Sequence, residues 1–212
     1  MPRQTRRRSY DQYCAAARAL DAVGDRWTLL VVRELLAGPR RYTDLHADLP
    51  GVSTDVLASR LKDMERDGLA TRRRLPPPSA ATVYELTRRG ARLLPVLAAL
   101  ADWGAPELAE RRPTDAVRAH WFAIPLLRAL DAPQRTGVVE VRLDEGVFHV
   151  RLGSPGYGEG PDYGDGPAAA PDACLTLDAD TCIALGSGEL ALADGVRAGR
   201  VKVEGDATVL GL

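Results

Sequence analysis

The stretch from Ser53 to Gly68 constrains the fold more than any other, because it contains both the start and the stop signal of a helix. Ser53 can accept a hydrogen bond from a free backbone N–H group of the first turn and so act as the N-cap. Gly68 supplies the left-handed residue that commonly ends a helix. Between them, Leu57, Leu61 and Met64 form one apolar stripe at helical spacing. The stretch is therefore predicted to be an amphipathic helix packed on a core.

The outer face of this predicted helix is polar, rich in hydroxyl groups and basic. A short helix and a Pro-Gly turn at residues 50–51 precede it, which is the order of a helix-turn-helix, so we predict a DNA recognition helix. Lys62 is expected to contact phosphate, and Ser53 can instead be only a cap. The side chains expected to read base edges in the major groove are those of Ser53, Thr54, Asp55, Ser59 and Arg60.

Two short strands are predicted after the helix, over residues 69–75 and 81–86. The prolines at positions 76–78 cannot be helical and form the tip of a hairpin. A basic hairpin beside a recognition helix is typical of a winged helix-turn-helix, although surface arginines are more often simply solvated. The arginines expected to contact DNA around this wing are Arg72, Arg73 and Arg74, together with Arg40 and Arg41 before the recognition helix.

Further helices are predicted on both sides of this unit. Residues 11–23 are expected to form the first helix, and residues 1–9 a flexible basic arm. The second helix, which contains Trp27 and Leu35, is apolar on most sides and is predicted to be buried at the centre. After the wing, a helix is expected that Pro95 kinks and Gly104 ends.

The net charge of −1 hides an asymmetry between the two halves of the chain. Residues 1–112 contain 20 Lys and Arg against 14 Asp and Glu, whereas residues 113–212 contain 8 against 15. A basic half beside an acidic half suggests that only the first half meets a polyanion, unless the split is accidental. The sequence shows no signal peptide and no apolar run of membrane-spanning length, so we expect a cytoplasmic protein that does not enter a membrane.

The first half resembles the HxlR family of bacterial transcription regulators over about residues 12–105. The motifs that support the resemblance are Asp21–Leu30, Gly38–Tyr42, Leu49–Ser53, Leu57–Leu61, Asp67–Leu69, Tyr84–Thr87 and Trp103–Gly104. The resemblance implies a winged helix dimer whose first and last helices form the two-fold contact, and it implies a palindromic operator in double-stranded DNA. It also suggests a redox-sensing thiol at Cys14, for which a buried structural cysteine is the alternative.

The second half is predicted to be a small α+β domain. A linker at residues 106–113 is followed by a helix over 114–130, a hairpin from Val138 to Leu152 and a long Gly- and Pro-rich loop at 153–171. A strand, two short helices and a last strand complete it. The overall class is therefore α+β, with a winged helix-turn-helix at residues 10–105, mostly α with a β-hairpin wing, and a second domain at 114–212.

The second half resembles the sterol-carrier-protein type-two fold, which encloses an apolar tunnel for lipid-like molecules. The motifs are Pro171–Ala173, Gly188–Leu190 and Gly199–Asp206. A pocket for a small hydrophobic effector is therefore expected, although the same residues can be an ordinary packed core. The candidates for its lining are Trp121, Phe122, Phe148, Leu175 and Leu185.

No catalytic pair, metal box or nucleotide loop is evident, so neither an enzyme nor a cofactor is expected. The histidines His46, His120 and His149 are predicted to be isolated from one another, and Cys174 and Cys182 to lie in the core. We therefore predict a dimeric, ligand-responsive DNA-binding repressor. The alternative is a lipid or small-molecule carrier without DNA specificity.

Overall fold

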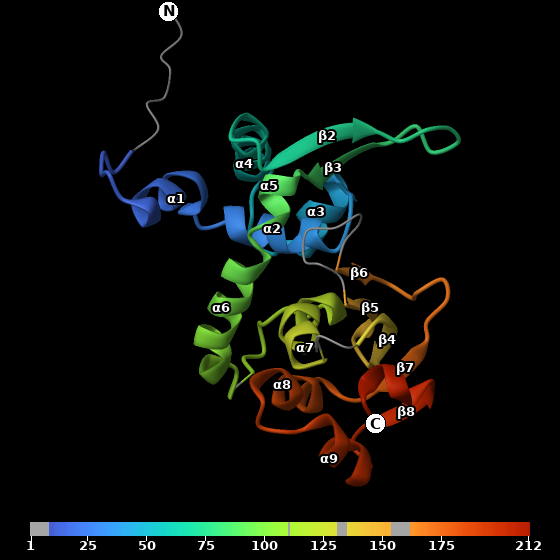
Figure 1. The fold of residues 1–212 in the computed structure, drawn as a ribbon. Helices are drawn as coiled ribbons and strands as arrows, with labels where there is room; N and C mark the ends of the chain where they lie inside the picture. The colour runs from blue at the N-terminus through green and yellow to red at the C-terminus, as the bar shows by residue number, and fades with distance from the viewer. Residues whose placement is uncertain (1–8, 110, 131–134, 154–161) are drawn as a thin grey trace, which may run out of the picture.

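The computed structural model describes residues 9–109, 111–130, 135–153 and 162–212, without the side chain of Ala109. Figure 1 shows a helical first half with a projecting hairpin, stacked on a second half that contains most of the strands. The predicted arm at residues 1–9 lies almost wholly outside the described residues. The helices of the first half are α1 (Ala15–Val23), α2 (Thr28–Leu36), α3 (Tyr42–Asp48), α4 (Thr54–Arg66), α5 (Arg88–Ala91), α6 (Leu94–Gly104) and the 3-10 helix η1 (Ala105–Ala109).

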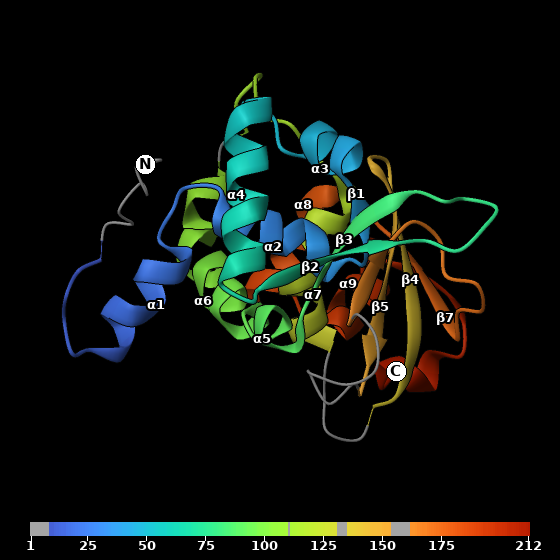
Figure 2. The ribbon, with the colours of Figure 1, turned by 90° about the horizontal axis from the view of Figure 1, so that it is seen from above.

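Helix α2 is the centre of the first half, as its apolar sequence predicts. Val31 and Val32 on α2 have no exposed surface. Leu57, Leu61 and Met64 of α4 are all buried in the same core, so the predicted apolar stripe is confirmed. The strands β1 (Arg40–Arg41), β2 (Ala70–Arg74) and β3 (Thr82–Leu86) form an antiparallel sheet in the order β1-β3-β2, and β2 and β3 project as the wing (Figure 2).

Two helix boundaries of the first half differ from the prediction. Helix α1 begins at Ala15 rather than near residue 11, and Tyr13 lies fully exposed before it. The helix expected after the wing is divided into α5 and α6, and Pro95 occupies the first turn of α6. A proline fits there because the N–H groups of a first turn have no partner within the helix.

The second half is a five-stranded sheet with helices on one side. Strands β4 (Gly137–Leu143) and β5 (Gly146–Leu152) form the predicted hairpin, and β4 also pairs in parallel with β7. The sheet order is β6-β5-β4-β7-β8. Its remaining elements are η2 (Ala119–Phe122), α7 (Ala123–Leu130), β6 (Tyr163–Asp165), β7 (Ala173–Thr176), α8 (Ala179–Ser187), α9 (Leu192–Arg197), β8 (Lys202–Gly205) and η3 (Ala207–Leu210).

Two predictions for the second half are wrong in part. The helix expected over 114–130 exists only as η2 and α7, from Ala119 to Leu130. The segment 153–171, expected to be a loop throughout, contains strand β6, and Tyr163 on it is 1% exposed. Tyr163 is anchored across the molecule, since its hydroxyl donates to the carbonyl oxygen of Arg33 on α2 at 2.8 Å.

The two halves share one connected apolar core, which contains Val32 of α2 and Phe148 of β5 alike. The boundary predicted at residues 106–113 therefore separates two sequence regions that pack against each other. None of the described helices is long and apolar enough to cross a membrane.

Candidate nucleic-acid interface

Two hydrogen bonds hold the first turn of helix α4, and a glycine follows its last turn. The Ser53 hydroxyl accepts a hydrogen bond from the backbone N–H of Val56 at 3.3 Å, as predicted for an N-cap. The Tyr42 hydroxyl of α3 donates to the carbonyl oxygen of Thr54 at 2.8 Å. Gly68 has φ +67°, which is the left-handed conformation predicted for the residue after the helix. These contacts fix the direction in which α4 presents its outer face.

The outer face of α4 consists of exposed polar side chains. Asp55, Ser59 and Lys62 are exposed and follow one another at helical spacing. Arg66 continues this row one turn farther on, with 57% of its side chain exposed, and pairs with Asp63 at 2.7 Å. Arg66 was not among the predicted DNA contacts, although its spacing from Lys62 could have identified it. Thr54 and Ser53 are exposed at the N-terminal end of the same face.

Arg60 differs from the other cations of α4 because its side chain is largely covered and also pairs with a carboxylate outside the helix. Arg60 pairs with Asp63 at 2.7 Å and with Asp25 at 3.5 Å, and only 24% of its side chain is exposed. This geometry ties α4 to the segment before α2. A base contact by Arg60 would have to break both ion pairs.

The three arginines of the wing lie exposed along β2. Arg73 pairs with Glu85 on β3 at 2.9 Å, and Arg72 lies 4.0 Å from Glu65 on α4. Arg74 donates to the carbonyl oxygen of Ala80 at 3.4 Å. Exposed ion pairs of this kind contribute little to stability, so a phosphate group can replace the carboxylate partner.

Arg40 and Arg41 adjoin in sequence but face different surroundings. Arg41 is exposed, and its guanidinium group donates to the Ser79 hydroxyl near the wing tip at 3.3 Å. Arg40 is only 16% exposed and pairs with Asp165 of β6 at 3.0 Å. Arg40 therefore connects the two halves of the protein, whereas Arg41 is oriented toward the wing.

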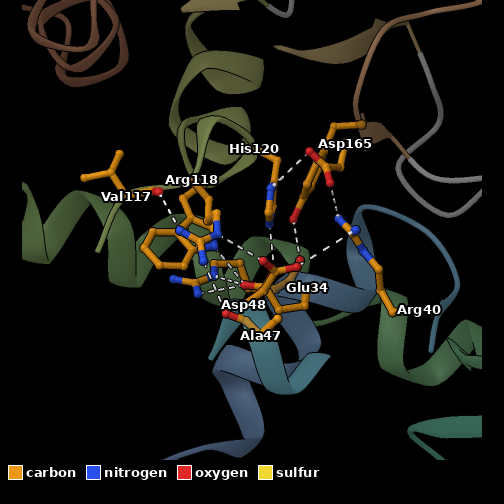
Figure 3. A network of polar contacts seen from close by, with 11 residues as sticks. Glu34, Arg40, Ala47, Asp48, Val117, Arg118, His120 and Asp165 are labelled. Atoms are coloured by element: carbon orange, nitrogen blue, oxygen red, sulfur yellow. Dashed lines mark hydrogen bonds and ion pairs between the residues drawn. The ribbon is translucent and has the colours of Figure 1, made fainter. Parts of the chain in front are cut away.

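Arg40 belongs to a group of charged side chains between the two halves, which we call the polar junction. Figure 3 shows His120 between Glu34 of α2 and Asp165 of β6. The Nε2 atom of His120 lies 2.6 Å from Glu34 Oε2, and its Nδ1 atom lies 3.3 Å from Asp165 Oδ1. The members of the polar junction are Glu34, Arg40, Asp48, Arg118, His120 and Asp165.

Burial and pairing act in opposite directions on the titratable groups of the junction. Burial disfavours the charged form of His120, yet hydrogen bonds to Asp165 and Glu34 outweigh it and raise the pKa of His120. Burial likewise opposes ionisation of Glu34, yet His120 and Arg33 lower its pKa. The hydrogen bond from His120 lowers the pKa of Asp165 to about 2. The junction is therefore held together by a charged imidazolium between two carboxylates.

Glu34 is the most enclosed member of the junction, with no exposed side-chain surface. Its Oε1 atom accepts a hydrogen bond from the indole N–H of Trp121 at 2.9 Å and pairs with Arg33 at 2.7 Å. Both carboxylate oxygens thus have partners, as a buried charge requires. Trp121 stacks beneath the Arg33 guanidinium, 4.1 Å from the ring centre, and so completes the enclosure.

Ligand atoms of Glu34, Asp48 and His120 lie within 4.8 Å of one another, which is close enough to hold a metal ion. However, Arg118 donates to Asp48 at 3.0 Å, and Arg40 lies 4.0 Å from the same carboxylate. Guanidinium groups in these positions already neutralise the carboxylates and would repel a divalent cation. The arrangement is that of an ion-pair network rather than a metal centre.

The prediction for His120 concerned only the other histidines and the cysteines, and it did not foresee its carboxylate partners, which come from distant elements that the sequence does not place together. A signal was nevertheless present, since Arg33 and Glu34 are adjacent charged residues within a mainly apolar helix that was predicted to be buried. His149 is also engaged, and its Nδ1 atom lies 3.0 Å from the carbonyl oxygen of Gly166.

The residues predicted to line an effector pocket are placed in different surroundings. Phe148 and Leu175 are fully buried in the packed core, Phe122 packs against it in part, and Trp121 is bonded to Glu34. Leu185, on α8, lines a groove of about 650 Å³ between α6, α7 and α8. The structure therefore does not gather the five candidates around one described cavity.

The cysteines follow the predictions only in part. Cys182 is buried, and burial raises the pKa of its thiol to about 12, so the thiol remains protonated. Cys174 is half-buried beside Arg142 and Glu140. Cys14 is exposed immediately before α1, so the buried alternative does not apply to it.

Comparison with known proteins gives a consistent result for the first half. Residues 22–112 match the family model described as HxlR-like helix-turn-helix. The Bacillus subtilis protein YvaP, an HTH-type transcriptional regulator, is 36% identical over 86 residues, which are 41% of this chain and 80% of YvaP. The regulator YodB of the same organism is 32% identical over 85 residues, which are 40% of this chain and 76% of YodB.

Matches to solved structures cover a similar share of this chain. Reduced YodB from B. subtilis has a TM-score of 0.40 at 30% identity, over 44% of this chain and 92% of that one. A MarR-family regulator from Porphyromonas gingivalis has a TM-score of 0.42 at 28% identity, over 46% of this chain and 96% of that one. On the strength of the sequence match to four-fifths of YvaP, the chain belongs to the HxlR-like helix-turn-helix family of transcription regulators.

Proposed function

We propose that this protein is a dimeric repressor that binds a palindromic operator with α4 in the major groove and the wing on the backbone. The observation that supports this most directly is the exposed polar row of α4 beside three exposed arginines of β2. Arg60 and Arg40 are the weaker candidates among the predicted contacts, because their side chains are only 24% and 16% exposed and pair with carboxylates of the protein. The protein is expected to act in the cytoplasm.

Exposed apolar side chains on α1 and α6 support the proposal of a dimer. Val96, Leu100 and Trp103 form one row at helical spacing on α6, and Trp103 is 83% exposed. Leu20 on α1 is 48% exposed. Covering these side chains with a second copy would remove apolar surface from water. A two-fold dimer would place the two α4 helices in successive major grooves, roughly 34 Å apart.

The test uses DNA that flanks the protein's own gene in a mobility-shift assay. Reversing Arg72, Arg73 and Arg74 to glutamate should weaken binding by a factor of about 100 or more, since phosphate contacts provide most of the affinity. The control reverses three exposed cations of the second half, Arg151→Glu, Arg197→Glu and Lys202→Glu, which changes the net charge equally. Equally weakened binding in both triple variants would contradict a specific role of the wing.

The carrier alternative is favoured by one observation, the groove of about 650 Å³ beside α8. A carrier would bind hydrophobic ligands and show no preference among DNA sequences. The sterol-carrier-like fold of residues 114–212 and the effector function stay proposals, because the family match ends at residue 112.

A further inference from the structure

We propose that the groove between α6, α7 and α8 binds a compact hydrophobic cation, and that this ligand is the effector of the proposed regulator. The effector role depends on the proposed function, whereas the binding site does not. The groove measures about 650 Å³, within the range of roughly 300–1,000 Å³ that small-molecule sites occupy.

The walls of the groove are mainly apolar and come from both halves of the protein. Ala101 and Pro106 line it from the first half, and Pro125, Ile183 and Leu185 line it from the second half. Figure 1 shows α6 on one side of this region, with α7 and α8 on the other. A ligand here would contact α6, which also presents the exposed apolar row proposed as the dimer contact. Occupation of the groove can therefore alter the angle of α6.

The charge around the groove favours a cation. Three charged side chains line it, namely Asp102, Arg128 and Glu189, and Asp102 and Arg128 form an ion pair with each other. Glu189 is exposed and leaves an excess negative charge at the rim. The C-terminal turn of α8, residues 185–187, also lines the groove, and the end of a helix carries a partial negative charge. Both contributions oppose an anionic ligand.

The shape of the groove limits the ligand to a compact molecule. Gly186 packs tightly against Pro125, because a Cβ atom at Gly186 would lie 2.8 Å from the Pro125 ring. Both residues line the groove, so α7 and α8 are in close contact there. A Cβ atom at Gly188 would meet nothing within 4 Å, so the groove is open at the end of α8. A rounded or branched cation fits such a site better than a long acyl chain.

Binding is tested by calorimetric titration of the full chain with two probes of the same size and shape. Tetraphenylphosphonium is the cation and tetraphenylborate is the matched anion. We expect saturable binding of the cation, and binding of the anion that is weaker by about tenfold or more. Absence of saturable cation binding, or equal affinity for both probes, would overturn the proposal.

Two variants of the lining and one control variant test whether the cation binds in the groove. Ala129→Trp places a bulky side chain at an exposed position of the lining and should reduce cation affinity at least tenfold, whereas Ala198→Trp, at the end of α9, should leave the affinity unchanged. Glu189→Gln should lower the affinity for the cation about two- to fivefold and should not lower the affinity for the anion. Unchanged affinity in Ala129→Trp would place the probe elsewhere and overturn the assignment.

The effector role has a separate readout. Tetraphenylphosphonium should shift the operator-binding midpoint of the wild-type protein and not that of Ala129→Trp, since a ligand changes DNA affinity only by binding one arrangement more tightly than the other. Saturable binding with an unchanged midpoint would overturn the effector role. Failure of the ligand-free protein to bind any operator would instead refute the proposed function and leave the binding result intact.

Discussion

Glu34 is a buried carboxylate at the contact between the two halves. A carboxylate with no exposed surface must have partners for both oxygens, and His120, Trp121 and Arg33 provide them. Two of these three partners lie in the second half of the chain. The same carboxylate in an isolated first half would be open to water, so its burial results from the packing of the two halves.

The stability of the junction should depend on pH through His120. Because the folded-state pKa of His120 is raised above 6.5, its contribution is complete below that value and is lost as the pH rises through the raised pKa. The pKa of Asp165 is lowered from 3.8 to about 2, so its contribution is complete above 3.8 and is lost as the pH falls toward 2. The junction therefore contributes most to the free energy of unfolding between pH 3.8 and pH 6.5.

We predict that His120→Gln lowers the free energy of unfolding by about 3 kcal/mol near pH 5.5, since it removes one partner from a buried charged pair. The destabilisation should be smaller at an alkaline pH, because the imidazole of the wild-type protein loses its charge as the pH rises through its raised pKa. Urea denaturation at both pH values provides the measurement. His46→Gln, the same substitution at a histidine outside the junction, is the control. A destabilisation by His120→Gln that is independent of pH would mean that the imidazole acts only by packing.

At the scale of elements, the residue after the C-terminal end of α4 allows a test of that boundary. Gly68 has φ +67°, and a Cβ atom there would meet nothing within 4 Å, so the cost of Gly68→Ala is conformational only. We predict a decrease of about 1 kcal/mol in the free energy of unfolding. Gly104→Ala is the matched control, because its Cβ would also meet nothing and its φ is not in the left-handed region. That variant should be neutral or stabilising by up to about 1 kcal/mol. Equal effects in thermal or urea unfolding would contradict the left-handed assignment of Gly68.

Elements with local signals could be predicted from the sequence, whereas elements stabilised from a distance could not. Ser53, Gly68 and the stripe between them define α4 without help from the rest of the chain. Strand β6 could not be predicted because only its pairing with β5 and the burial of Tyr163 make it a strand. The segment before Ala119 does not form a helix, and there Arg118 reaches back to Asp48 instead.

The candidate site divides in the same way. The exposed row on α4 and the arginines of β2 follow from helical and strand periodicity, which the sequence displays. The pairing of Arg60 with Asp63 follows helical spacing, but the pairs that Arg40 makes with Asp165 and Arg60 with Asp25 join residues that no local pattern relates. Long-range electrostatic pairing is therefore what sequence periodicity could not provide.

At the scale of the whole molecule, the unequal charge of the halves should govern how DNA binding responds to salt. Residues 1–112 have an excess of basic side chains and residues 113–212 an excess of acidic ones, so phosphate binding is confined to one side. We predict that replacing Arg72, Arg73 and Arg74 by alanine reduces the slope of log affinity against log salt by about 1 for each phosphate that is no longer neutralised. Fluorescence anisotropy at several salt concentrations measures the slope. A weaker complex with an unchanged slope would mean that these arginines do not neutralise phosphates.

The parallel pair of β4 and β7 lies in the interior of the second-half sheet. At the edge of the same sheet, the hydroxyl of Tyr163 on β6 reaches α2. A chimaera that joined this winged helix to a different sensor would lack that anchor and would leave the carboxylate at position 34 without its imidazole. Modular exchange at this point in the chain is therefore restricted: any newly recruited sensor that buries Glu34 must supply a partner for the Oε2 atom that His120 now contacts, or the winged helix must first acquire a neutral residue there.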